Sequence, residues 1–217
     1  MAEGVSVLRC SMRGRLMFLR HIWGLFAHPA AEWQTIHDER CTIGKCYCSH
    51  VLMLAAIPAI CGYLGATQVG WQIGYHANTK LTTDSALPIA ILFYITLLVG
   101  VFTVGKLMHW MASTYGAVTS LPQCIALAAY TATPLFLIGL TALYPLLWLD
   151  MVLGLPALAY SVYLLYTGVP IMMEIPAERG FLFSSAVLAV GLVMLVGMMA
   201  ASAMLWSWGV GPVFTGG

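Results

Sequence analysis

Five long apolar stretches, separated by short polar segments, dominate the pattern of the chain. A helix that crosses a bilayer needs about 20 mostly apolar residues, and each of the five is long enough. They lie at 51–71, 86–111, 123–149, 151–173 and 182–208. The pattern therefore predicts an all-α, polytopic integral membrane protein with five transmembrane helices.

The third and fourth stretches are divided only at Leu149-Asp150-Met151. Read as one helix, they would be about twice as long as a membrane crossing. Pro145 and Pro156 flank the division, and each lacks the backbone N–H that a continuous helix requires. The carboxylate of Asp150 prefers the headgroup region to the apolar core. A tight hairpin at Asp150 is therefore expected, with the third and fourth helices as antiparallel neighbours.

The basic residues are distributed unequally about the five spans. Only Lys80 falls on one side, whereas the other eight fall on the opposite side: Arg9, Arg13, Arg15, Arg20, Arg40, Lys45, Lys106 and Arg179. Because loops rich in Lys and Arg stay in the cytoplasm, the N-terminus is expected inside and the C-terminus outside. The chain then divides into a cytoplasmic segment (1–49), a transmembrane domain (50–209) and a short external tail (210–217).

The segment before the first span has the periodicity of an amphipathic helix. On a helical wheel, His21 falls on the polar face, and the opposite face carries Phe18, Leu19, Ile22, Trp23, Leu25 and Phe26. Basic amphipathic helices lie in the headgroup plane, so this segment is expected to be a short interfacial helix anchored by Trp23 and Phe26. An irregular tail is the alternative, because short apolar runs are ambiguous.

Lys106 and Trp110 follow the apolar part of the second span. A lysine at this depth can extend its side chain to the headgroups, and tryptophan is enriched at the membrane interface. Both residues are therefore expected to be interface anchors. An ion or proton pathway through Lys106 is the alternative.

The composition supports a membrane protein and excludes nucleic-acid binding. Hydrophobic residues make up 61% of the chain and charged residues 8%, whereas soluble domains are about 25% charged. So few charges cannot cover a globular surface. The net charge of +1 leaves no basic surface to neutralise a phosphate backbone.

Three motifs resemble a known family. They are Trp23-Gly-Leu-Phe-Ala-His-Pro29, Ala132-Thr-Pro134 and Tyr160-Ser-Val-Tyr163-Leu-Leu-Tyr166-Thr-Gly168-Val-Pro170. In this order, around five spans, they resemble the Yip domain family of Ypt/Rab-interacting membrane proteins, in particular its bacterial inner-membrane branch.

The resemblance implies five transmembrane helices, a cytoplasmic N-terminus, the bacterial inner membrane as location and no established catalytic activity. Eukaryotic members are associated with small GTPases, vesicle traffic and membrane shaping. A bacterial member has no Rab protein to bind, so that role is not carried over to this chain.

Thiols and imidazoles cluster before the first span, at His37, Cys41, Cys46, Cys48 and His50. Thiolate and imidazole ligands suit zinc or copper(I), which makes these residues a candidate metal site. However, Cys-x-Cys is not the usual zinc spacing. Reduced, unliganded cysteines are the alternative, and no cofactor is assigned.

Hydroxyl-bearing side chains form stripes on the third and fourth spans. The third span carries Tyr130, Thr133, Thr141 and Tyr144, and the fourth carries Tyr160, Tyr163, Tyr166 and Thr167. Polar side chains in membrane helices face other helices, where their hydroxyls join neighbours. We therefore expect these two faces to pack together. The lining of a substrate path is the alternative.

No catalytic motif was recognised in the sequence, neither a metalloprotease helix pair, nor a nucleophile elbow, nor a carboxylate pair within a span. The sequence therefore favours a non-catalytic membrane protein that organises the lipid bilayer or membrane-protein partners, with a homo-oligomer among the expected assemblies. A transporter or channel for a small solute or ion is the alternative.

Overall fold

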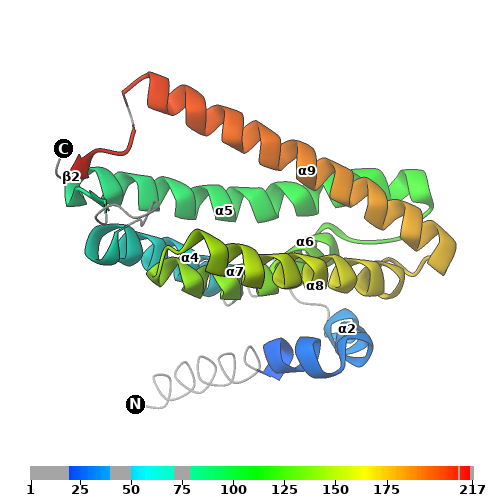
Figure 1. Cartoon of the computed structure of the whole chain (residues 1–217). Coiled ribbons are helices and arrows are strands. Elements are labelled where there is room, and N and C mark those ends of the chain that lie inside the picture. Colours follow the sequence, from blue (N-terminus) through cyan, green and yellow to red (C-terminus); the bar gives the residue numbers. More distant parts are fainter. Residues whose placement is uncertain (1–19, 40–49, 71–78, 210, 216–217) are drawn as a thin grey trace, which may run out of the picture.

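The computed structural model describes residues 20–39, 50–70, 79–209 and 211–215. Within them, five helical spans are long and apolar enough to cross a membrane, which confirms the predicted fold class. They are Leu52–Val69, Thr83–Tyr115, Leu121–Leu143, Leu147–Met173 and Ala177–Ser207. In Figure 1 they run across the picture, with α5 and α9 above α4, α6, α7 and α8.

The first two spans are joined outside the described residues. The first consists of α4 (Leu52–Leu64) and a π-helical turn, η2 (Gly65–Val69). The second consists of α5 (Thr83–Ala112) and a 3-10 turn, η3 (Ser113–Tyr115). Asp84 in the first turn of α5 and His109 in its last turn are placed favourably for the helix dipole.

The third span is the centre of the bundle and is broken twice. It contains α6 (Leu121–Thr131), α7 (Thr133–Ile138) and the 3-10 turn η4 (Gly139–Leu143). Pro134 lies in the first turn of α7. A backbone N–H in this turn has no acceptor within the helix, so its absence in proline costs no helical hydrogen bond. Every residue from Cys124 to Tyr130 is buried, so α6 is covered on all sides.

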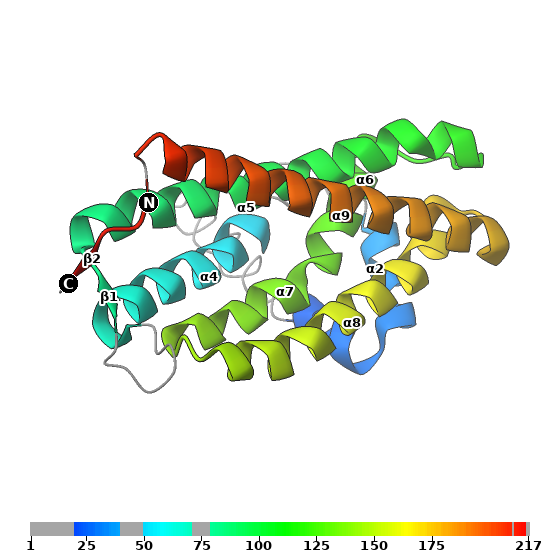
Figure 2. The same ribbon diagram turned by 45° about the horizontal axis from the view of Figure 1, so that its top comes forward.

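The hairpin between the third and fourth spans does not lie at Asp150. The chain turns at Tyr144-Pro145-Leu146, and α8 (Leu147–Met173) starts immediately afterwards. Proline disfavours a helical conformation in the residue before it, and this stops η4 at Tyr144. Asp150 instead lies in the first turn of α8, where a carboxylate is favourable. Figure 2 shows α7 and α8 side by side near this turn.

The last span, α9 (Ala177–Ser207), packs on the bundle only along its first turns. Its buried residues are Gly180, Phe183, Ser184 and Val187, and none of the residues from 188 to 207 is buried. The far end is held instead by a short antiparallel ribbon, in which β2 (Phe214–Thr215) pairs with β1 (Lys80–Leu81). Figure 1 shows α9 diverging from α8 toward this end.

A further helix, α2 (Pro29–Asp38), follows a helical segment over 20–27. Together they form the N-terminal helix pair. In Figure 1 this pair lies below α8, and α2 is seen nearly end-on, so it crosses the direction of the spans. Pro29 at the start of α2 separates the two helices.

Candidate functional site

The N-terminal helix pair is docked on the fourth span. The Tyr160 hydroxyl donates a 2.7 Å hydrogen bond to the carbonyl of Leu25, and the Phe26 ring stacks on Tyr160 with centroids 5.1 Å apart. Trp33 is fully buried, and its indole lies against Gly168 of α8. The pair is therefore packed against the bundle along one side.

We expect a Tyr160→Phe variant to loosen this docking. The ring and its stacking remain, but the Leu25 carbonyl loses its donor, at a cost of about 1–3 kcal/mol. Hydrogen exchange of residues 20–38 in micelles should become faster. Tyr163→Phe is the matched control, because Tyr163 is half exposed. Equal exchange in the two variants would contradict a docking role for the Tyr160 hydroxyl.

An imidazole between two carboxylates holds the helix pair together. His21 Nδ1 lies 2.5 Å from Glu32 Oε1, and its Nε2 lies 3.2 Å from Glu39 Oε2. Gly24 leaves room for this contact, since a Cβ there would lie 2.0 Å from Glu32 Oε2. The sequence pattern places His21 on a polar outer face, but the structure buries it.

Tyr130 is the point at which the N-terminal helix pair meets the first and third spans. Its ring contacts His21 at 5.8 Å, Trp33 at 6.4 Å and His50 at 4.3 Å between centroids. His50 Nε2 lies 2.9 Å from the hydroxyl of Thr133, and both residues are buried. We call His21, Glu32, His50, Tyr130 and Thr133 the polar cluster.

His50, which precedes the first span, is held in its neutral form. Burial, reinforced by the charge of His21, lowers the pKa of its imidazole to about 3. At neutral pH the uncharged ring therefore forms one hydrogen bond with the Thr133 hydroxyl. Through these hydrogen bonds and ring contacts the cluster joins three distant parts of the chain.

The contacts of the polar cluster link the N-terminal helix pair to the bundle. The His21 contacts engage Glu32 and Glu39 on either side of its ring. Among the described residues, no group of three His, Cys, Asp or Glu side chains is arranged to hold a metal ion.

Comparison with known proteins identifies the chain. The Yip1 domain matches residues 23–198. The chain belongs to the Yip1 domain family. The matched region begins at Trp23 and includes the whole polar cluster except His21.

Two relatives match this chain over most of its length. Both are "Inner membrane protein YohC", from Escherichia coli strain K12 and from Escherichia coli O6:H1. Each is 46% identical over 191 residues, which cover 88% of this chain and 98% of the relative. No solved structure gives a significant match. With its five membrane-crossing helices, this Yip1 domain protein is a multi-pass protein of the bacterial inner membrane, as the sequence predicts.

The candidate metal site of the Yip1 domain chain remains a hypothesis. Cys41, Cys46 and Cys48 lie outside the described residues. The two histidines of the candidate site have different partners: His37 Nε2 lies 3.1 Å from Glu174 Oε1, whereas His50 contacts Thr133.

The hydroxyl stripes of the Yip1 domain have partners that differ from the expected ones. The third and fourth spans are neighbours, but Thr133 pairs with His50 and Tyr160 with Leu25. The Tyr166 hydroxyl lies 2.8 Å from Ser185 of α9, and Thr167 bonds within its own helix to the carbonyls of Tyr163 and Leu164.

One predicted hydroxyl does connect the third and fourth spans. Thr141 of η4 donates to Asp150 Oδ1 at 2.6 Å. Tyr144, at the hairpin, is largely exposed. The way in which the helices pack in three dimensions decides the partner of each hydroxyl. A helical wheel of one span carries no information on that packing.

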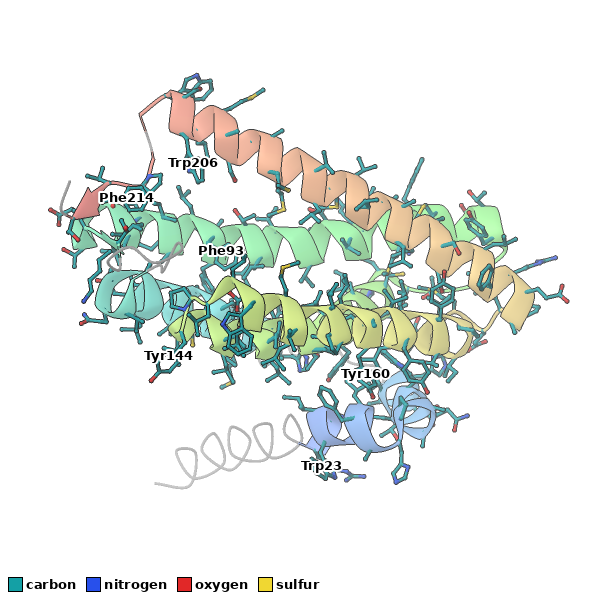
Figure 3. All side chains as sticks on the ribbon, in the orientation of Figure 1. Trp23, Phe93, Tyr144, Tyr160, Trp206 and Phe214 are labelled. Atoms are coloured by element: carbon teal, nitrogen blue, oxygen red, sulfur yellow. The ribbon has the colours of Figure 1, made fainter. Side chains whose placement is uncertain are left out.

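The four expected anchors all have exposed side chains. Trp23 and Trp110 are 76% and 75% exposed, and Phe26 and Lys106 are also exposed. Figure 3 shows Trp23 on the side of the N-terminal helix pair that faces away from the bundle. Their contact with headgroups stays a prediction.

Proposed function

We propose that this Yip1 domain membrane protein is non-catalytic and organises the lipid around it, with the N-terminal helix pair acting on the cytoplasmic leaflet. The observation that carries the proposal is that one side of the helix pair is buried and the other side is exposed. Trp33 is fully buried against the bundle, while Trp23 is 76% exposed on the outer side. Tryptophan that is exposed next to a membrane domain is typical of residues at the headgroup level.

The arrangement of charge supports the same proposal. Arg20 of the helix pair, Lys106 and Arg179 belong to the side that the basic residues assign to the cytoplasm. Basic side chains beside a bilayer are attracted to anionic lipids of the cytoplasmic leaflet. Because α2 crosses the direction of the spans (Figure 1), it would displace lipid in one leaflet only.

A reconstitution experiment tests this function. We expect the protein to shift the diameter distribution of vesicles that contain anionic lipid, and a Trp23→Ser variant to lose most of that shift. The removal of the exposed aromatic anchor explains the loss. Trp110→Ser is the matched control, because Trp110 is equally exposed but lies on α5. Vesicles that the wild-type protein leaves unchanged would refute the proposal.

A transporter of a small solute or ion is the second candidate. The buried contact of His50 with Thr133 of the third span favours it, since ionisable groups buried beside membrane helices often belong to transport paths. Solute flux into the same vesicles, abolished by Thr133→Val in protein that still folds, would favour transport over lipid organisation.

A further inference from the structure

An apolar pocket of about 770 Å³ lies toward the end of the bundle that carries the β1–β2 ribbon, and none of the polar cluster residues lines it. It is bounded by α4, η2, α5, α7, η4, the start of α8, the end of α9 and the β1–β2 ribbon. Its lining includes Ala59 and Gly62 of α4, Phe93 of α5, Gly154 of α8 and Trp206 of α9. Figure 3 shows Trp206 on α9 and Phe93 on α5 near this end.

Small residues and the divergence of α9 create this space. A Cβ added at Gly62 or Gly154 would meet no atom within 4 Å. No residue of α9 beyond 187 is buried, so that helix does not fill the gap. The volume lies within the range of about 300–1,000 Å³ that is usual for small-molecule sites.

Among the described residues that line the pocket there is one carboxylate and no basic side chain. Asp150 is part of the lining, and its Oδ1 accepts the hydrogen bond from Thr141. Among the described residues, no Lys, Arg or His lies within ion-pair distance of Asp150. A carboxylate beside apolar walls is costly unless a donor or a cation reaches it, and Thr141 supplies one donor only.

The position of Asp150 suits a lipid headgroup. It lies in the first turn of α8, at the end of a span. Tyr144 and Trp148, which precede it, are both largely exposed, as is typical of aromatic residues at a membrane interface. The carboxylate is therefore at headgroup level, while the apolar walls extend along the spans.

We propose that this pocket binds one membrane phospholipid whose headgroup carries a primary amine, as phosphatidylethanolamine does. An acyl chain occupies the apolar space between Gly62, Gly154 and Phe93, and the ammonium group donates to Asp150. The charge complementarity selects the amine, because an ammonium supplies both the cation and the donor that the carboxylate lacks. The proposal does not rest on the function assigned to the N-terminal helix pair, which lies outside the pocket.

Lipid binding to delipidated wild-type protein in detergent, measured by native mass spectrometry, tests the headgroup. Phosphatidylethanolamine and phosphatidylcholine with the same acyl chains differ in the methylation of the amine, which removes the hydrogen-bond donors. We expect wild-type protein to prefer phosphatidylethanolamine about tenfold, as one hydrogen bond to a charged group would give. Asp150→Asn should bind both lipids without preference. Equal binding of the two lipids by the wild type would overturn the assignment of the amine.

A pair of matched variants tests the acyl site. Gly154→Leu fills the pocket, whereas Gly197→Leu makes the same change on α9 outside the lining. Neither added Cβ meets an atom within 4 Å, so both variants should fold. Binding should be lost in Gly154→Leu alone. Equal retention in both variants would overturn the site, whereas the Trp23→Ser variant should bind as the wild type does.

Discussion

A Gly65→Ala variant is expected to lose about 3 kcal/mol of unfolding free energy, because the added methyl group has no space. Its Cβ would lie 1.9 Å from the carbonyl oxygen of Ala142, a backbone atom that cannot rotate away. At the same interface, a Cβ on Gly139 would lie 2.4 Å from Pro58 Cβ. The two spans therefore meet backbone to backbone, as small residues allow in membrane bundles.

Denaturation by SDS of protein in mild-detergent micelles measures this loss. Gly191→Ala serves as the control, since a Cβ at Gly191 of α9 meets no atom within 4 Å. Alanine favours a helix over glycine by up to about 1 kcal/mol, so the control should be as stable as the wild type or slightly more stable. Similar stability in both variants would mean that the first and third spans do not approach as closely as described.

We expect the second large effect from Trp33→Ala, which removes the side chain that fills the contact between α2 and the bundle. Its indole is fully buried, edge-on to Tyr130 and against Gly168. Truncation of a buried tryptophan costs about 3–5 kcal/mol. Because α2 is attached to the spans through this contact, most of the loss should appear as undocking of the N-terminal helix pair.

Hydrogen exchange of residues 20–38, compared with exchange in α6, separates local undocking from global unfolding. Trp23→Ala is the control, because Trp23 is mostly exposed and surface substitutions usually change stability by less than about 0.5 kcal/mol. If Trp33→Ala leaves the exchange of residues 20–38 unchanged, the helix pair is not held by this side chain.

The sequence contains enough information to predict the five spans, because a run of apolar residues must be about as long as a bilayer is thick. It predicts turns less well. The hairpin was expected at Asp150, the polar residue, but Pro145 ends η4 first and leaves Asp150 inside α8. A charge marks the headgroup region, whereas backbone geometry decides where the chain reverses.

The helical wheel of the N-terminal segment could not show which side would be covered. It groups Trp23 and Leu25 on one face and His21 on the other. In the structure Leu25 and His21 are buried, and Trp23 is exposed. The residues that cover His21 are Glu32 and Tyr130, and the separation of Tyr130 from His21 in the sequence gives no local signal. The apolar pocket gives no local signal for the same reason, since its walls come from segments spread along the chain from α4 to β2.

The β1–β2 ribbon determines where the bundle can come apart with the smallest free-energy cost. A two-stranded ribbon has little stability of its own, and here it secures the end of a helix whose last twenty residues have no buried side chain. Local opening occurs first where few buried contacts must be broken. We therefore expect lipid to enter the interior from the bilayer beside Trp206. The pairing of Lys80 and Leu81 with Thr215 and Phe214 closes this route.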